Sequence, residues 1–176
     1  MRIHPTPLAG VMQVYASPHT DDRGLFARTF CADLFAANGL ESSFRQASTS
    51  WNPHIGTLRG LHLQMAPKGE VKLVRATRGR VFDVTVDLRP DSPSYRAWVA
   101  IELDAARRNA VYIPEGCAHG YMTMEAGCEV SYLISQPYDP DSARTFRWND
   151  PAFGIRWPDE PYIISPKDAE APDFQP

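Results

Sequence analysis

The chain has 176 residues, of which 43% are hydrophobic and 22% charged, and it carries a formal net charge of −3. This composition predicts one globular domain over residues 1–176 with a real core, and the mild acidity disfavours a nucleic-acid-binding protein, which usually shows a basic surface. Three cysteines without CxxC spacing disfavour a disulfide framework or zinc cluster, and the absence of a signal peptide or membrane-length apolar run predicts a cytoplasmic protein without membrane contact.

Sixteen prolines and eleven glycines interrupt the chain, which favours short strands and turns over long helices. The N-terminal part predicts a strand over 10–15, a turn over 19–24 and a strand over 25–30. Residues 32–38 form the best helix candidate, short and peripheral, and Asn38-Gly39 is a typical stop signal.

Further strands are predicted in the middle of the chain, and two runs around Arg78-Gly79 read as a hairpin. Trp51-Asn52-Pro53 separates the strand predicted over 44–50 from the one over 57–64. From Ser135 the alternating pattern gives way to Pro- and Asp-rich loops. The tail over 170–176 is predicted to fray. About nine short strands without a βαβ rhythm indicate an all-β fold, an antiparallel barrel or double-sheet jelly roll. The predicted strands cover 44–50, 57–64, 71–77, 80–88, 98–103, 111–113, 119–124 and 128–134.

The strand over 57–64 carries Arg59, His62 and Gln64 among apolar residues. An arginine and a histidine there predict the floor of a pocket for an anionic molecule that gains or loses a proton, although such residues are more often structural when taken alone. Strict alternation puts Arg59 and His62 on opposite faces, and a bulge or kink at Gly60 would reconcile them.

In the run that follows, Lys72 shares a face with Val74 and Ala76, whereas Phe82, Val84, Val86 and Leu88 share another. An ammonium that points into an apolar interior must be neutralised by a ligand or a carboxylate. The alternative is that the faces are reversed and Lys72 is exposed.

Two spacings resemble the cupin type of jelly roll: His62-x-Gln64 with Glu70 and Gly79, and Pro114-x-Gly116-x-x-His119. In metal-binding cupins the position of Gln64 holds a third histidine. His62, Glu70 and His119 still leave open a metal-dependent cupin enzyme as the alternative function.

Seven segments in this order resemble the dTDP-4-dehydrorhamnose 3,5-epimerase family, over about residues 10–169. They are Asp22-Arg23-Gly24-x-Phe26, Leu58-Arg59-Gly60-Leu61-His62, Lys72-Leu73-Val74-Arg75, Gly79-x-Val81-Phe82-Asp83-Val84, Ile113-Pro114-Glu115-Gly116-x-Ala118-His119-Gly120, Trp148-x-Asp150-Pro151 and Ser165-x-Lys167-Asp168.

The resemblance implies a cupin-like isomerase that needs neither metal nor cofactor and epimerises a nucleotide-linked 4-keto-6-deoxyhexose at C3, C5 or both through an enolate. His62 matches the family's base and Asp168 its dyad partner. Lys72 matches the residue that stabilises the enolate, and Tyr132 matches the acid on the opposite side.

The same resemblance implies a set of substrate contacts and a homodimer whose N-terminal strands cross to the partner subunit. Arg23 matches a phosphate contact, and Phe26 could stack on the base. The other implied contacts are Arg59, His119, Tyr138 and Lys167, and Arg28, Gln46 and Ser48 stand at positions that touch base or sugar.

The sequence departs from the family at Arg28, Ala47, Ser48, Leu133 and Ala143, outside the implied catalytic residues. Arg28 offers only donors, whereas the N3–H of thymine requires an acceptor. CDP is therefore the leading alternative to dTDP as the nucleotide, and Ser48 in place of asparagine leaves the choice between C3 and C5 open. A non-catalytic sugar-nucleotide-binding protein and a ketoisomerase are the remaining alternatives.

Overall fold

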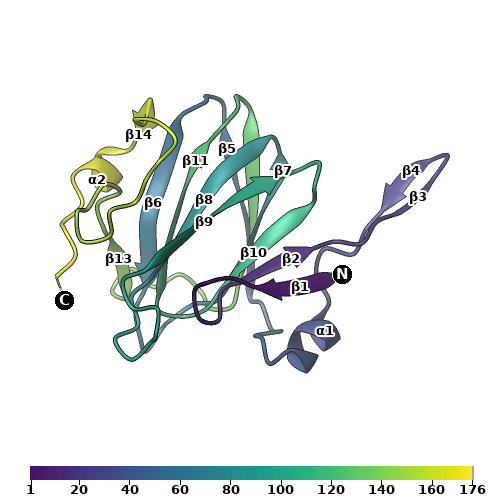
Figure 1. The fold of residues 1–176 in the computed structure, drawn as a ribbon, viewed down its shortest axis with the longest axis horizontal. Coiled ribbons are helices and arrows are strands. Elements are labelled where there is room, and N and C mark those ends of the chain that lie inside the picture. Colours follow the sequence, from purple (N-terminus) through teal and green to yellow (C-terminus); the bar gives the residue numbers. More distant parts are fainter. Residues whose placement is uncertain (176) are drawn as a thin grey trace.

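The computed structural model describes residues 1–175 and contains two six-stranded sheets that enclose the main core (Figure 1). The first sheet has the order β1 (Arg2–Pro5), β2 (Met12–Tyr15), β10 (Asn109–Ile113), β7 (Lys72–Arg78), β12 (Cys128–Ile134) and β5 (Gln46–Asn52). The second has the order β13 (Ala143–Thr145), β6 (Thr57–Gln64), β11 (Cys117–Thr123), β8 (Arg80–Asp87) and β9 (Trp98–Asp104), and β14 (Ile163–Ile164) pairs with β6 in parallel. The other pairings are antiparallel, so the predicted all-β class is confirmed.

The two-residue period of the strands sorts their side chains between the interior and two outer layers. Val74 and Ala76 of β7 meet Val81 and Leu103 of the opposite sheet in the interior. The outer face of the first sheet is covered by α1 (Ala32–Ala37), which buries Phe35.

The other face of β8 (Arg80–Asp87) carries Phe82, Val84 and Val86, and Leu88, just beyond the strand, joins the same cluster, as predicted. This face of β8 packs against the segment that follows β13, and aromatic residues of that segment complete the outer layer of the second sheet. They are Phe146, Phe153, Trp157 and Phe174.

The predicted hairpin between residues 71–77 and 80–88 is wrong, because β7 and β8 belong to different sheets. Both edges of β7 are occupied by β10 and β12, and both edges of β8 by β11 and β9. Gly79, at φ +71°, turns the chain from one sheet to the other. A short glycine link looks the same in sequence whether it joins paired strands or crosses between sheets.

The strand predicted over 25–30 is shorter in the structure. β4 (Gly24–Phe26) pairs only with β3 (His19–Asp21), and the two form an exposed arm that projects from the body (Figure 1). The helix forms as predicted over Ala32–Ala37, and Gly39 adopts φ +69° just beyond it.

The C-terminal part is more ordered than the sequence suggested. It adds β13, β14 and α2 (Pro166–Ala169), in a region predicted as loops. Within the tail over 170–175, Ala171 is buried, and the Phe174 ring contacts Phe146 and Phe153. Pro176 lies outside the described residues.

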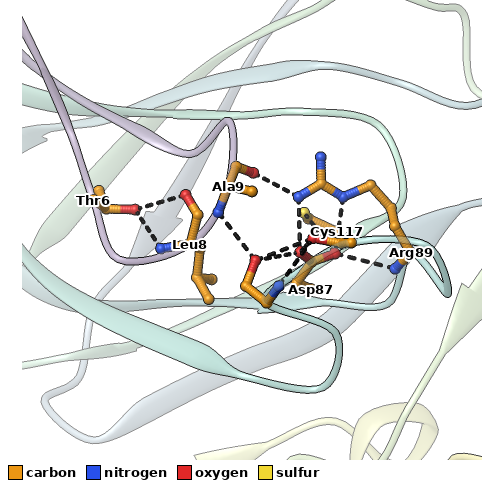
Figure 2. Close-up of polar contacts among 8 residues, drawn as sticks. Thr6, Leu8, Ala9, Asp87, Arg89 and Cys117 are labelled. Carbon is orange, nitrogen blue, oxygen red and sulfur yellow. Dashed lines mark hydrogen bonds and ion pairs between the residues drawn. The ribbon is translucent and has the colours of Figure 1, made fainter.

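An ion-pair cluster joins the N-terminal loop to the end of β8, as Figure 2 shows. The buried Asp87 carboxylate accepts hydrogen bonds from Arg89, Ser92 and Ser94. Arg89 also donates to the Ala9 carbonyl, and the Ala9 amide donates to Ser94. Burial alone would raise the pKa of Asp87, but these hydrogen bonds outweigh it and hold the pKa well below its usual value.

Within residues 1–175, no helix is both long enough and apolar enough to cross a membrane.

Candidate active site

A cavity of about 470 Å³ lies between the sheets and is lined by β5, β7 and β12 from one sheet and β6 and β11 from the other. It brings together nine of the thirteen site residues predicted from sequence, although they span more than a hundred positions of the chain. They are Gln46, Ser48, Arg59, His62, Lys72, His119, Tyr132, Tyr138 and Lys167.

Asp168 reaches this site from α2 and contacts His62. The Asp168 Oδ1 atom lies 2.8 Å from His62 Nε2, and its Oδ2 accepts from the Gly60 amide. Ser165 caps α2 by accepting from the Asp168 amide, which fixes the short helix. Burial would raise the pKa of Asp168, but the His62 contact and the hydrogen bond from the Gly60 amide help to lower it overall.

An ionised Asp168 can only accept, so His62 donates from Nε2 and keeps an unprotonated Nδ1 when neutral. The His62 side chain is 43% exposed, whereas that of Asp168 is 6% exposed. This arrangement leaves a basic nitrogen at an accessible wall of the cavity, with a buried carboxylate that would stabilise the imidazolium.

Gly60 carries the irregularity that lets Arg59 and His62 line one cavity. On β11, His119 pairs with His62 and Tyr121 with Arg59, so β6 has one more residue than its partner between these pairs. Gly60 has φ +117°, and a Cβ there would lie 2.6 Å from the Gly120 Cα and 2.7 Å from the His119 carbonyl oxygen. Only glycine fits this close approach.

Lys72 is buried on the cavity wall, and a carboxylate from its own strand region neutralises it. Its Nζ lies 2.9 Å from Glu70 Oε1, and the two side chains are 10% and 12% exposed. The exposed orientation considered from sequence does not occur. An ammonium held in this way could donate to an oxygen that develops negative charge in the cavity.

Tyr132 and His119 form the deep end of the cavity, where their rings meet edge to face with centroids 6.3 Å apart. Burial raises the pKa of the Tyr132 phenol well above its usual value, so it is a proton donor at neutral pH. His119 Nε2 lies 2.7 Å from Oδ2 of the buried Asp83, a second histidine–aspartate contact.

The three side chains of the metal-dependent alternative do not converge on a common point. His62 contacts Asp168, Glu70 contacts Lys72 and His119 contacts Asp83. Among residues 1–175, no three His, Cys, Asp or Glu side chains are placed to share a metal ion.

Gln64, at the third ligand position of metal-binding cupins, is engaged with backbone groups instead. It is buried, donates to the carbonyls of Lys68 and Pro137, and accepts from the Asp139 amide.

Arg23, Phe26 and Arg28 are not brought to the cavity. Arg23 and Phe26 lie on the β3–β4 arm and Arg28 just after it, where Arg23 pairs with Asp21 and Phe26 is 75% exposed. Alternation and motif matching give no information on where an arm projects in space.

Several residues of the site were not singled out from sequence as site residues: Ser50, Asn52, Asp83, Tyr121, Arg144 and Thr145. Asp83 stood inside a quoted motif, but nothing in the sequence pairs it with His119, 36 positions away. Ser50 and Tyr121 occupy ordinary strand positions, and only the packing of two sheets brings their hydroxyls together, 2.7 Å apart.

Comparison with known proteins gives a consistent result. Residues 5–176 match the family model described as dTDP-4-dehydrorhamnose 3,5-epimerase. The chain is 42% identical over 155 residues to the dTDP-4-dehydrorhamnose 3,5-epimerase of Sinorhizobium fredii, covering 88% of this chain and 80% of that protein. It is 37% identical over 172 residues to the dTDP-4-dehydrorhamnose 3-epimerase of Streptomyces niveus, covering 97% and 83%.

A solved structure agrees with these matches. The crystal structure of the Bacillus anthracis dTDP-4-dehydrorhamnose 3,5-epimerase, with TDP and PPi bound, superposes with a TM-score of 0.95 at 32% identity, covering 98% of this chain and 99% of that one.

Proposed function

The chain belongs to the dTDP-4-dehydrorhamnose 3,5-epimerase family, and on that premise we propose that it inverts C3, C5 or both of a nucleotide-linked 4-keto-6-deoxyhexose through an enolate. The family makes it an isomerase of the nucleotide-sugar epimerase type. The observation that carries the residue assignment is the His62–Asp168 contact of 2.8 Å at the wall of a cavity that also holds Lys72 and Tyr132.

The 4-keto group acidifies the hydrogens on C3 and C5, so a base near neutral pKa can remove them. His62 takes this proton on its free nitrogen, and the ionised Asp168 stabilises the imidazolium that results. The electron pair left on carbon moves to the keto oxygen as an enolate.

Lys72 donates to the enolate oxygen, and Arg59 and His119 hold the sugar. Tyr132 then returns a proton to the opposite face of the carbon, which inverts the centre. A base and an acid on opposite faces are the minimum that inversion requires.

The nucleotide binds toward the rim, where Tyr138 and Lys167 are available, with Gln46 and Ser48 on β5. Arg23, Phe26 and Arg28 reach the nucleotide only from a second subunit, so a homodimer with exchanged arms is part of the proposal. Arg28 favours a base with an acceptor at N3, which makes CDP the alternative to dTDP. Titration with dTDP, CDP and GDP tests this, and a clear preference for dTDP would exclude CDP as the nucleotide.

The reaction is tested by incubating the protein in D2O with 4-keto-6-deoxyglucose linked to dTDP or CDP. Deuterium at C3, C5 or both, with inversion, gives the activity and its regiochemistry together. His62→Asn should abolish the exchange, and His54→Asn, which changes an exposed histidine that lies edge to face with Tyr162 outside the cavity, serves as the matched control. Exchange at the wild-type rate in His62→Asn would place the base elsewhere.

A further inference from the structure

Four side chains beyond the proposed catalytic residues form a continuous chain of polar contacts behind Tyr132. The Tyr132 hydroxyl lies 3.4 Å from Ser50 Oγ, which lies 2.7 Å from the Tyr121 hydroxyl. Tyr121 contacts Asn52 Oδ1 at 3.3 Å, and the same oxygen accepts from Arg59 Nε at 2.9 Å. These contacts run from β12 to β5, across to β11, back to β5 and then to β6, so they link the two sheets.

Asn52 sets the direction of these hydrogen bonds. Its Nδ2 faces two backbone carbonyls, those of Ser50 at 3.4 Å and Cys128 at 3.3 Å, so its Oδ1 is the atom that faces Arg59 and Tyr121. An amide oxygen only accepts, and the Tyr121 hydroxyl must therefore donate to it. The Tyr121 oxygen then accepts from Ser50, which leaves the Ser50 oxygen to accept from Tyr132.

We propose that Ser50 and Tyr121 form a hydroxyl relay that reverses direction when Tyr132 gives its proton to the substrate carbon. The proposal rests on the proposed function, in which Tyr132 is the acid. Ser50 and Tyr121 are positioning residues in it, because neither exchanges a proton with the sugar.

The reversal needs only the rotation of two hydroxyl groups. Once Tyr132 is a phenolate it can only accept, so Ser50 turns its hydrogen toward Tyr132 and Tyr121 turns its own toward Ser50. Asn52 Oδ1 keeps its hydrogen bond from Arg59 throughout. No covalent bond changes in the relay, and Tyr132 regains its proton from solvent after the product leaves.

The depth of the site explains why such a relay is needed. Tyr121 is 1% exposed, and it contacts the Tyr132 hydroxyl through Ser50. Burial penalises the phenolate and raises the pKa of Tyr132, which weakens it as a donor unless the resulting charge receives a hydrogen bond. Hydrogen bonds to a charged oxygen are about twice as strong as neutral ones, so the relay acts mainly on the charged form.

The test compares inversion with solvent exchange, both measured in D2O on the same nucleotide sugar. His62 can remove a proton and return a deuteron to the same face, which gives exchange without inversion, whereas inversion requires Tyr132. In Ser50→Ala, which removes the donor to the phenolate, we expect inversion to fall about tenfold relative to exchange, as for the loss of a hydrogen bond to a charged group. Tyr121→Phe removes only the hydroxyl that donates to Ser50, so it should lower the ratio in the same direction but by less, and Ser50→Thr, which keeps the hydroxyl, should have the wild-type ratio.

Two controls separate the possible failures. Tyr112→Phe removes another buried hydroxyl, which accepts from the Glu41 amide outside the cavity, and it should leave the ratio unchanged. Tyr132→Phe should abolish inversion and retain exchange. If Tyr132→Phe still inverts, the proposed acid is wrong and the relay falls with it. If Tyr132→Phe behaves as expected but Tyr121→Phe keeps the wild-type ratio, or loses exchange and inversion equally, only the relay is overturned.

Discussion

Asp168 shows how a single carboxylate can define the properties of the site. Its partners, His62 Nε2 and the Gly60 amide, are both donors, and they lower its pKa despite burial. Since an unperturbed aspartate has a pKa of about 4, Asp168 stays ionised above that pH. The His62 tautomer with a free Nδ1 is therefore favoured across the neutral range.

Replacing Asp168 by asparagine should leave the fold intact but remove the charge that stabilises the His62 imidazolium. An amide can also present its NH2 group to His62 and so favour the wrong tautomer. We expect turnover to fall about 10²- to 10⁴-fold, by analogy with other histidine–aspartate pairs. Steady-state kinetics measure this, and turnover within twofold of wild type would show that His62 acts without Asp168.

At the scale of the element, β6 brings to one cavity two side chains that a regular strand would place on opposite faces. Its extra residue at Gly60 puts Arg59 and His62 on the same cavity, and the close approach to Gly120 holds the irregularity in place. A regular β6 would turn one of the two side chains into the outer layer.

The change Gly60→Ala should therefore disturb both stability and catalysis. A Cβ at 2.6 Å from the Gly120 Cα requires the backbone to move, and the φ of +117° is strained for any other residue. We expect an unfolding free energy lower by about 2 kcal/mol or more and a large loss of turnover.

Gly154→Ala is the matched control, because Gly154 also has positive φ, at +61°, but a Cβ there meets nothing within 4 Å. Its effect on stability should be about 1 kcal/mol, with turnover unchanged. Equal effects of the two substitutions on turnover would show that the shape of the bulge is unimportant.

The end of β8 is the second element with a defined energetic role. Asp87→Asn removes the charge that holds Arg89, Ser92 and Ser94, and we expect a loss of about 3–5 kcal/mol, typical for breaking a buried ion pair. Denaturant unfolding at neutral pH measures it, and Asp21→Asn on the exposed arm is the control with no expected change.

The difference in unfolding free energy between wild type and Asp87→Asn should depend on pH in a defined direction. The pKa of Asp87 is lowered in the folded state, so its contribution is fully present above its unfolded pKa of about 4. The contribution decreases as the pH falls through the lower folded value. The gap between wild type and Asp87→Asn should thus be constant from neutral pH to about pH 5 and narrow only below about pH 4. A gap that already narrows above pH 5 would contradict this account.

At the scale of the whole molecule, the β3–β4 arm and the cavity are separate in one subunit. The arm projects from the body (Figure 1). Arg23 and Phe26 are exposed on the arm, whereas His62 and Tyr132 line the cavity. If arms are exchanged in a homodimer, each site combines the body of one subunit with the arm of the other.

Subunit mixing tests this arrangement. His62→Asn and the double variant Arg23→Ala/Phe26→Ala should each have little activity alone. After unfolding and refolding as an equal mixture, half of the dimers are mixed and each has one complete site, so roughly a quarter of wild-type activity should return. A mixture no more active than its components would mean that the arm serves its own subunit or that no dimer forms.

The fold class followed from local information. Frequent Pro and Gly, two-residue alternation and the αL stop at Gly39 act over a few residues, and these signals predicted α1 and the strands of the central part of the chain, whereas β1, β3, β13 and β14 were not predicted. The family match depended on ordered motifs, such as those around His62 and His119, and is shown by the comparisons. The roles assigned to the site residues remain proposals that the experiments above test.

Only the tertiary structure decided which strands pair and which side chains meet. β7 and β8 are neighbours in sequence but lie in different sheets, because each finds both of its partners elsewhere. The contacts of His119 with Asp83 and of Tyr121 with Ser50 arise from register between distant strands, which local propensity does not encode. The sequence alone determined which chemical groups the protein has, and the packing of the two sheets determined which of them stand within hydrogen-bonding distance.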